Sequence, residues 1–156
     1  MKNIGDYIVW RKEVCKIKDI KNNLYVLEPI DDTTLTLQVP INSQVLRDLI
    51  KKKDIDKLLK EIPSIDTVNS SDRLIEQTYK ELMQNGTYED LIKIIKTTYL
   101  RNENRKNNKK KISEVDNEYF NKAEGYLYNE FSIVLNLSFD ETKEYVIKTV
   151  SSLIEN

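Results

Sequence analysis

The chain of 156 residues carries 25 Lys and Arg side chains against 26 Asp and Glu, for a formal charge of −1. Hydrophobic residues make up 39% and charged residues 33%, which is the balance of a globular protein rather than a disordered one. No apolar run approaches the roughly 18 residues that span a bilayer. The chain starts with polar residues, which do not resemble the apolar region of a signal peptide. Its single cysteine, Cys15, cannot form an intrachain disulfide, and both features favour the cytosol.

The residue inventory argues against catalysis. The chain has no histidine and only three glycines, so it lacks His-based triads, His metal sites and glycine-rich phosphate loops. No spacing singles out a pair of carboxylates for acid/base work. We therefore expect no enzyme, with no catalytic residue, cofactor or metal.

Short strands are expected in the first 41 residues. Apolar and polar residues alternate, or β-branched and aromatic residues cluster, in residues 6–10, 14–20, 24–28 and 35–39. Asn22 and Asn23 form a turn, because asparagine tolerates a positive φ. Four short strands with tight turns predict a small, strongly bent antiparallel sheet. Within residues 34–39, Thr34, Thr36 and Gln38 face away from the apolar residues, which predicts an edge strand open to a partner.

Helical periodicity begins after residue 41. We expect a short helix from Asn42 or Ser43 through Lys52, a second capped by Asp54, and a connector over residues 62–70. A helix from about Ser71 ends at Gly86 and turns one face inward, which comprises Leu74, Ile75, Thr78, Tyr79 and Leu82.

Three patterns that are typical of helix N-termini follow: Thr87-x-x-Asp90, Ser113-x-x-Asp116 and Ser138-x-x-Glu141. Residues 102–112 are a polar, basic stretch between the apolar faces of the first two of these helices.

Positive charge is concentrated in one segment. Residues 93–111 hold eight basic side chains and one acidic one. Such a segment on a near-neutral chain indicates either an anionic partner or a solvated helix end, and charge alone favours neither. If the partner is DNA, the candidate phosphate contacts are Arg73, Lys93, Lys96, Arg101, Arg105 and Lys109.

Four strings resemble the CarD/CdnL family of bacterial RNA polymerase-binding regulators. Residues 4–10 (I-G-D-Y-I-V-W) resemble its opening strand, V-G-D-x-V-V-Y, and residues 35–40 (L-T-L-Q-V-P) resemble its L-T-V-x-V-P strand. Residues 86–101 resemble its glycine turn and the helix ending in L-x-R-R. Residues 112–135 resemble L-S-x-x-E followed by A-x-x-L-x-x-E-L-A. The motifs occur in the family's order and cover nearly the whole chain.

The resemblance implies an α+β protein in two parts. A Tudor-like or SH3-like antiparallel β-module, residues 1–43, would bind the β subunit of RNA polymerase through Arg11, Thr34, Thr36 and Gln38. An all-helical domain, residues 44–156, would contact promoter DNA at the upstream edge of the melted region through the basic residues above. The protein would act as a monomer, without a membrane, and would alter the stability of the open promoter complex.

The sequence departs from the family pattern in two ways that bear on function. The tryptophan that wedges into the minor groove is missing from residues 66–72, where only Val68 is apolar, and the sole tryptophan is Trp10. A polymerase-facing position that is often arginine is Gln38, which offers a weaker neutral hydrogen bond. The alternative is therefore a polymerase- or protein-binding adaptor with little DNA contact.

Overall fold

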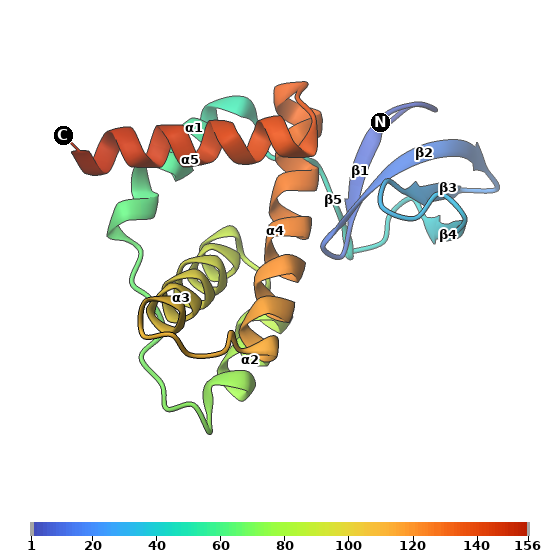
Figure 1. Cartoon of the computed structure of the whole chain (residues 1–156). Coiled ribbons are helices and arrows are strands. Elements are labelled where there is room, and N and C mark those ends of the chain that lie inside the picture. The colour runs from blue at the N-terminus through green and yellow to red at the C-terminus, as the bar shows by residue number, and fades with distance from the viewer. Residues whose placement is uncertain (1, 156) are drawn as a thin grey trace.

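The protein has an α+β fold, described for residues 2–155 in a computed structural model, with an antiparallel sheet followed by helices (Figure 1). The sheet order is β4-β3-β2-β1-β5, so β4 and β5 are its two edges. The strands are β1 (Tyr7–Trp10), β2 (Glu13–Lys21), β3 (Leu24–Pro29), β4 (Leu37–Pro40) and β5 (Leu46–Arg47). Asn22 and Asn23 both have positive φ, 53° and 61°, which confirms the expected turn between β2 and β3.

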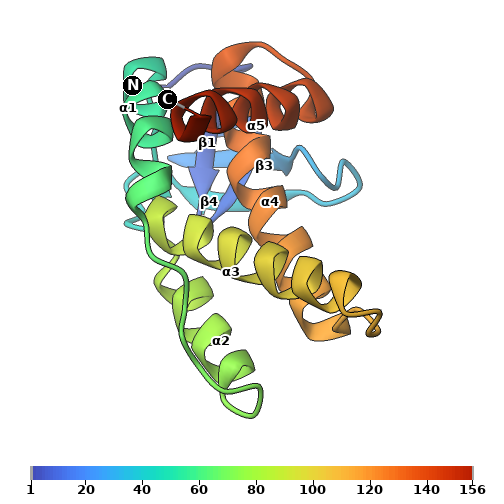
Figure 2. The same ribbon diagram turned by 60° about the vertical axis from the view of Figure 1, so that its left-hand side comes forward.

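The helices are α1 (Lys52–Glu61), α2 (Ile75–Asn85), α3 (Tyr88–Asn107), α4 (Glu114–Leu135) and α5 (Phe139–Glu155), with a 3₁₀ turn η1 (Ile62–Ser64) after α1. Figures 1 and 2 show α4 standing between the sheet and α3. In both views α5 lies beside α1 at one end of the helical body, and α2 lies at the other end.

The predicted helix boundaries are confirmed where a side chain caps the helix. The Thr87 and Ser113 hydroxyls accept the backbone N–H groups of Asp90 and Asp116, at 3.1 and 3.2 Å. Ser138 and Glu141 exchange two bonds of 3.0 Å in a complete capping box. Gly86 ends α2 with a φ of 68°, a conformation that glycine adopts without a steric cost.

The sheet and the helices have separate cores. One apolar cluster is built on Cys15, Ile17 and Leu27 of the sheet, and the other on helical residues that include Leu127 and Phe131. The two clusters share no buried residue. The sheet nevertheless reaches Arg47, beyond the expected boundary at residue 43.

The helix expected from Asn42 or Ser43 through Lys52 is wrong. Residues 46 and 47 form β5, which pairs with β1 through Trp10↔Leu46 and Val9↔Arg47, and the Arg11 N–H donates to the Val45 carbonyl at 2.8 Å. The open edge of β1 supplies these partners, and a local propensity cannot anticipate them. The following helix begins at Lys52, after an N-cap residue, Lys51, that makes no side-chain cap, so Asp54 lies in its first turn.

The polar, basic stretch at residues 102–112 is helical through Asn107, where α3 ends. One other expected boundary is wrong. The last strand begins at Leu37 rather than at residue 34 or 35, because the chain turns back onto Asp32. The Thr34 N–H donates to the Asp32 carboxylate at 3.1 Å, and the Leu35 N–H donates to the Asp32 carbonyl at 3.2 Å.

Candidate protein and nucleic-acid interfaces

The edge strand β4 offers unpaired backbone groups. It pairs with β3 through Tyr25↔Val39 and Leu27↔Leu37, and no other strand in the described part of the chain pairs with it. Residues of an antiparallel pair alternate between bonding to the partner and facing away from it. The N–H and C=O of Gln38 therefore point to the open edge, where the Gln38 side chain is also exposed.

The four candidate polymerase contacts do not form one cluster. Thr34 and Thr36 are exposed in the turn that leads into β4, next to Gln38 along the chain. Arg11 lies in the β1–β2 hairpin, and β2 and β3 separate β1 from β4. Its backbone has a φ of 58°, and its guanidinium lies 5.1 Å from the centre of the Trp10 ring.

Two of the candidate DNA contacts are engaged inside the helical body. The Arg101 Nε and the Arg105 Nη1 both donate to Asp116 Oδ2, at 3.0 and 2.5 Å. The Asp116 side chain is only 1% exposed and also accepts the Tyr79 hydroxyl at 2.8 Å. Arg101 donates further to Asp72 at 2.6 Å. These bonds join α3, α4 and the entry to α2, so both arginines are occupied by structural partners.

The pKa values around this cluster follow from its burial and charges. Burial and the hydrogen bond to Asp116 raise the pKa of the Tyr79 phenol. The hydrogen bond from Arg101 and its positive charge lower the pKa of Asp72, with smaller effects from Arg105 and Lys110. The bond from Arg101 to Asp72 thus holds α3 against the entry to α2.

The two lysines in the middle of α3 lie in surroundings that disfavour an anion. Lys96 Nζ donates to the carbonyls of Ile62 and Ile65, at 2.8 and 2.5 Å, and burial lowers the pKa of this ammonium group. Lys93 borders a surface hollow together with Glu61, Asp66 and Glu89. Acidic neighbours compete with phosphate for a lysine, so this part of α3 is a poor anion site.

Among the candidate DNA contacts and the basic segment 93–111, five cations remain exposed, and α1 carries further exposed lysines at the other end of the helical body (Figure 1). Arg73 precedes α2, and Lys106, Lys109, Lys110 and Lys111 occupy the end of α3 and the loop after it. We call these five residues the basic end. Lys106 makes a long ion pair with Glu103 at 3.6 Å.

An exposed leucine accompanies the basic end. Leu74, expected on the buried face of its helix, is 59% exposed at the N-cap of α2, next to Arg73. The helix begins at Ile75 rather than Ser71, which leaves Leu74 before its first buried turn. Val68 is half-buried against the helical core and donates its N–H to Thr97 at 2.8 Å. Leu74, not Val68, is thus the exposed apolar side chain in this region.

A buried charge cluster joins the sheet to the helices. Glu130 of α4 has a side chain that is 2% exposed, and it accepts both guanidinium nitrogens of Arg47 at 2.9 and 2.7 Å. It also accepts the Tyr88 hydroxyl at 2.6 Å and the Ile50 N–H at 2.8 Å. We call these four residues the joint. Burial and the bond to Glu130 raise the pKa of Tyr88.

The sequence held one signal for the joint. Glu130 sits between Leu127 and Phe131 on the apolar stripe of α4, and an ionised carboxylate there needs a buried partner. Its partner, Arg47, lies in a segment that we expected to be helical, so the sequence did not indicate this ion pair.

Other reactive groups are sparse. Burial raises the pKa of the Cys15 thiol to about 12, which makes it a poor nucleophile. Within residues 2–155, no group of three potential ligands is placed to hold a metal ion. None of the described helices combines the length and apolar character needed to cross a bilayer.

Comparison with known proteins identifies no relative: no protein-family model matches the chain, and the search of curated proteins gives no significant match.

Proposed function

We propose that this protein is a bacterial transcription regulator that binds the RNA polymerase β subunit and contacts promoter DNA at the upstream edge of the melted region. The β-module would bind polymerase, the helical body would approach the DNA, and the open complex would change in stability. The resemblance of four sequence strings to the CarD/CdnL family motivates the proposal. A Tudor-like identity for the β-module belongs to it as well.

The observation that carries the proposal is the open β4 edge of a sheet that is joined to the helices by buried charges. An exposed edge strand can add a strand of a partner protein through main-chain hydrogen bonds. Because the joint fixes the sheet to α4, a partner bound at β4 would hold the basic end in one orientation. Such tethering raises the effective concentration of DNA near weak cationic contacts.

The basic end supports weak DNA binding without sequence preference. Its five exposed cations can neutralise phosphates, and none of them is rigidly aligned for base contacts. Leu74 adds an apolar side chain beside Arg73, and leucine is among the residues that wedge between base steps. We therefore assign phosphate contact to the basic end rather than to Arg101 and Arg105.

A backbone substitution tests the polymerase contact. Gln38→Pro removes an N–H that faces the open edge and leaves the bonds between β3 and β4 intact. The matched control, Gln38→Ala, removes the side chain and keeps the N–H. We expect the proline variant to bind polymerase at least tenfold more weakly, while the alanine variant binds within a few-fold of the parent. Equal affinities for the folded proline variant and the parent would contradict binding through β4.

A protein-binding adaptor with little DNA contact is the second candidate. Arg101, Arg105 and Lys96 are engaged within the helical body, which reduces the charge available for DNA. Residues 66–72 also contain no aromatic side chain. The adaptor binds polymerase equally well but leaves open-complex lifetime unchanged, so the two candidates differ in a measurable quantity.

A further inference from the structure

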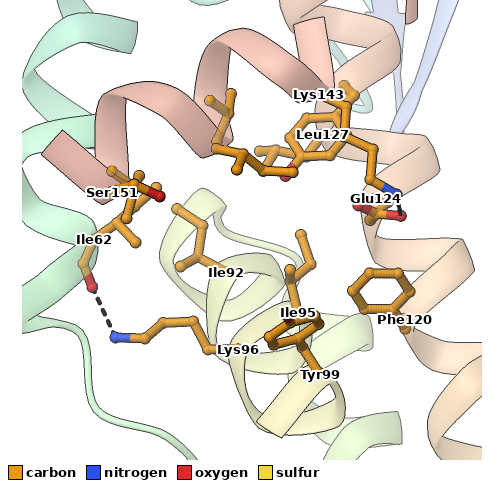
Figure 3. A pocket seen from close by; sticks show the side chains of 14 residues that line it. Ile62, Ile92, Ile95, Lys96, Tyr99, Phe120, Glu124, Leu127, Lys143 and Ser151 are labelled. Carbon is orange, nitrogen blue, oxygen red and sulfur yellow. Dashed lines mark hydrogen bonds and ion pairs between the residues drawn. The ribbon is translucent and has the colours of Figure 1, made fainter. Parts of the chain in front are cut away.

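A mostly apolar cavity of about 350 Å³ opens between α3, α4 and α5, away from both interfaces described above. Its walls include Ile92 and Ile95 of α3, Leu127 of α4, and Val146 and Val150 of α5 (Figure 3). This volume is at the lower end of the range for small-molecule sites. An apolar cavity of about 150 Å³ holds benzene, so this one suits a ligand of roughly 14 non-hydrogen atoms.

Two polar groups in the cavity wall lack full hydrogen bonding. Tyr128 is 4% exposed, and its hydroxyl has no hydrogen-bond partner among the described residues. Glu124 is 5% exposed and has a single contact there, from Lys143 Nζ to its Oε1 at 3.2 Å. Every described side-chain nitrogen or oxygen that is fully shut off from solvent does have a partner. The Tyr128 hydroxyl and the second Glu124 oxygen therefore keep some accessible surface, and the cavity that both residues line provides it.

Glu124 and Tyr128 are four residues apart on α4 and line the same cavity, so their side chains lie on one face of the helix. The charge of Glu124, after burial, contributes to the raised pKa of Tyr128. Burial also raises the pKa of Glu124 against the opposing effect of Lys143, which shows that one lysine compensates its desolvation only in part.

Lys143 already occupies the position that an ammonium group would take. Its Nζ lies 3.2 Å from Glu124 and 5.5 Å from the centre of the Phe120 ring, a combination of ion pair and cation–π contact. The side chain is 39% exposed, so it can move into solvent when another cation takes its place beside Glu124. In Figure 3 this pair lies on the opposite side of the cavity from Lys96, whose ammonium is bound to the Ile62 carbonyl.

We infer that the cavity binds a primary amine with an apolar body of about a dozen non-hydrogen atoms. The ammonium group donates to Glu124 and to the Tyr128 oxygen, and Lys143 moves out toward solvent. The apolar body fills the space between Ile95 and Val146. This inference is independent of the proposed function, because no residue of β4 or the basic end takes part.

The test uses three naphthyl compounds of equal size and the full chain. We expect naphthylethylamine to bind saturably by calorimetry and to raise the midpoint of thermal unfolding. The neutral alcohol analogue should bind about tenfold more weakly, and naphthylacetate more weakly still. Tighter binding of the acid than of the amine, or no saturable binding of the amine, would overturn the inference.

Three variants locate the site. Glu124→Gln and Tyr128→Phe remove the two acceptors, and each should weaken amine binding. The loss should be about tenfold or more for Glu124→Gln, which also removes the negative charge. Lys143→Met removes the resident cation and should tighten it, whereas an anion site would lose affinity.

Glu118→Gln, at an exposed α4 carboxylate that pairs with Lys122, is the matched control and should change nothing. Parent-like amine affinity in folded Glu124→Gln would also overturn the inference. If Lys143→Met fails to fold, Glu124→Gln and Tyr128→Phe are sufficient to test the amine site.

Discussion

Glu130 and Asp116 show how single buried carboxylates hold this molecule together. Each is nearly inaccessible, and each binds arginine together with a tyrosine hydroxyl. Removing one partner from such a group leaves a buried charge unpaired, which costs more than the loss of an exposed ion pair. The energetic weight of an arginine here thus depends on the carboxylate that it contacts.

Arg47→Met should lower the free energy of unfolding by about 2 kcal/mol, less than for a fully buried pair because Arg47 is 42% exposed. Lys122→Met, at an exposed pair with Glu118, should change it by less than about 0.5 kcal/mol. Urea unfolding of both variants measures the difference. Equal stabilities would contradict a structural role for the joint.

The same reasoning divides the basic residues into two groups that salt dependence can separate. Replacing Lys106, Lys109, Lys110 and Lys111 by Ala should flatten the dependence of DNA affinity on salt, by about 0.9 in the logarithmic slope for each phosphate that the variant no longer neutralises. Arg101→Gln should instead destabilise the fold and leave that slope unchanged in the folded fraction. A slope that responds only to Arg101 would reverse the assignment.

Three capping signals predicted from single side chains were reliable: Thr87, Ser113 and Ser138 cap their helices, and Gly86 ends α2. Asp54, by contrast, does not cap α1. β5 was missed because it exists only through pairing with β1. The position of Leu74 was missed for the related reason that α2 begins one turn late.

The two candidate interfaces could also be predicted from the sequence only in part. Alternation in residues 34–39 indicated an edge strand, and β4 (Leu37–Pro40) does lie at the sheet edge. Charge counting indicated a basic segment, but it could not distinguish cations that face solvent from those paired with Asp116, because that pairing spans more than ten residues of sequence.

The capping box of α5 gives a pH-dependent prediction. Hydrogen bonds from the Ser138 backbone and side chain lower the pKa of Glu141, so its stabilisation is complete above the ordinary glutamate pKa of about 4.3. That stabilisation is lost as the pH falls through the lower pKa of the folded state. Glu141→Gln should therefore speed amide exchange in the first turn of α5 at neutral pH, and the difference should vanish in acid. A difference that persists in acid would exclude the carboxylate as its cause.

The molecule consists of two cores that are joined where α4 packs against β2 and by a few polar contacts. Besides the joint, Asn129 of α4 donates to Asp31 of the β3–β4 turn at 2.5 Å. This arrangement places the open β4 edge and the basic end on different parts of one molecule. A regulator of the proposed kind needs both surfaces at once, because polymerase and DNA are bound together.

Leu74 tests whether this molecule presents an apolar contact to DNA. Leu74→Ala should shorten the lifetime of open complexes formed with the protein, and Leu74→Trp should lengthen it, because an aromatic ring stacks on bases with about 1–3 kcal/mol. Ser71→Trp, three residues earlier, provides a second position for the ring, and Ile147→Ala, at an exposed isoleucine of α5 away from both proposed interfaces, is the matched control. Unchanged lifetimes in all three variants at residues 71 and 74 would remove the wedge from the proposal.

The lifetime of the open promoter complex, measured by competitor challenge with polymerase saturated by this protein, tests the proposed regulator most directly. We predict a modestly longer lifetime that shrinks toward the protein-free value as salt increases, because phosphate contacts are screened. Gln38→Pro should abolish the effect at the same protein concentration. An unchanged lifetime with the protein demonstrably bound to polymerase would contradict the regulator and leave the adaptor.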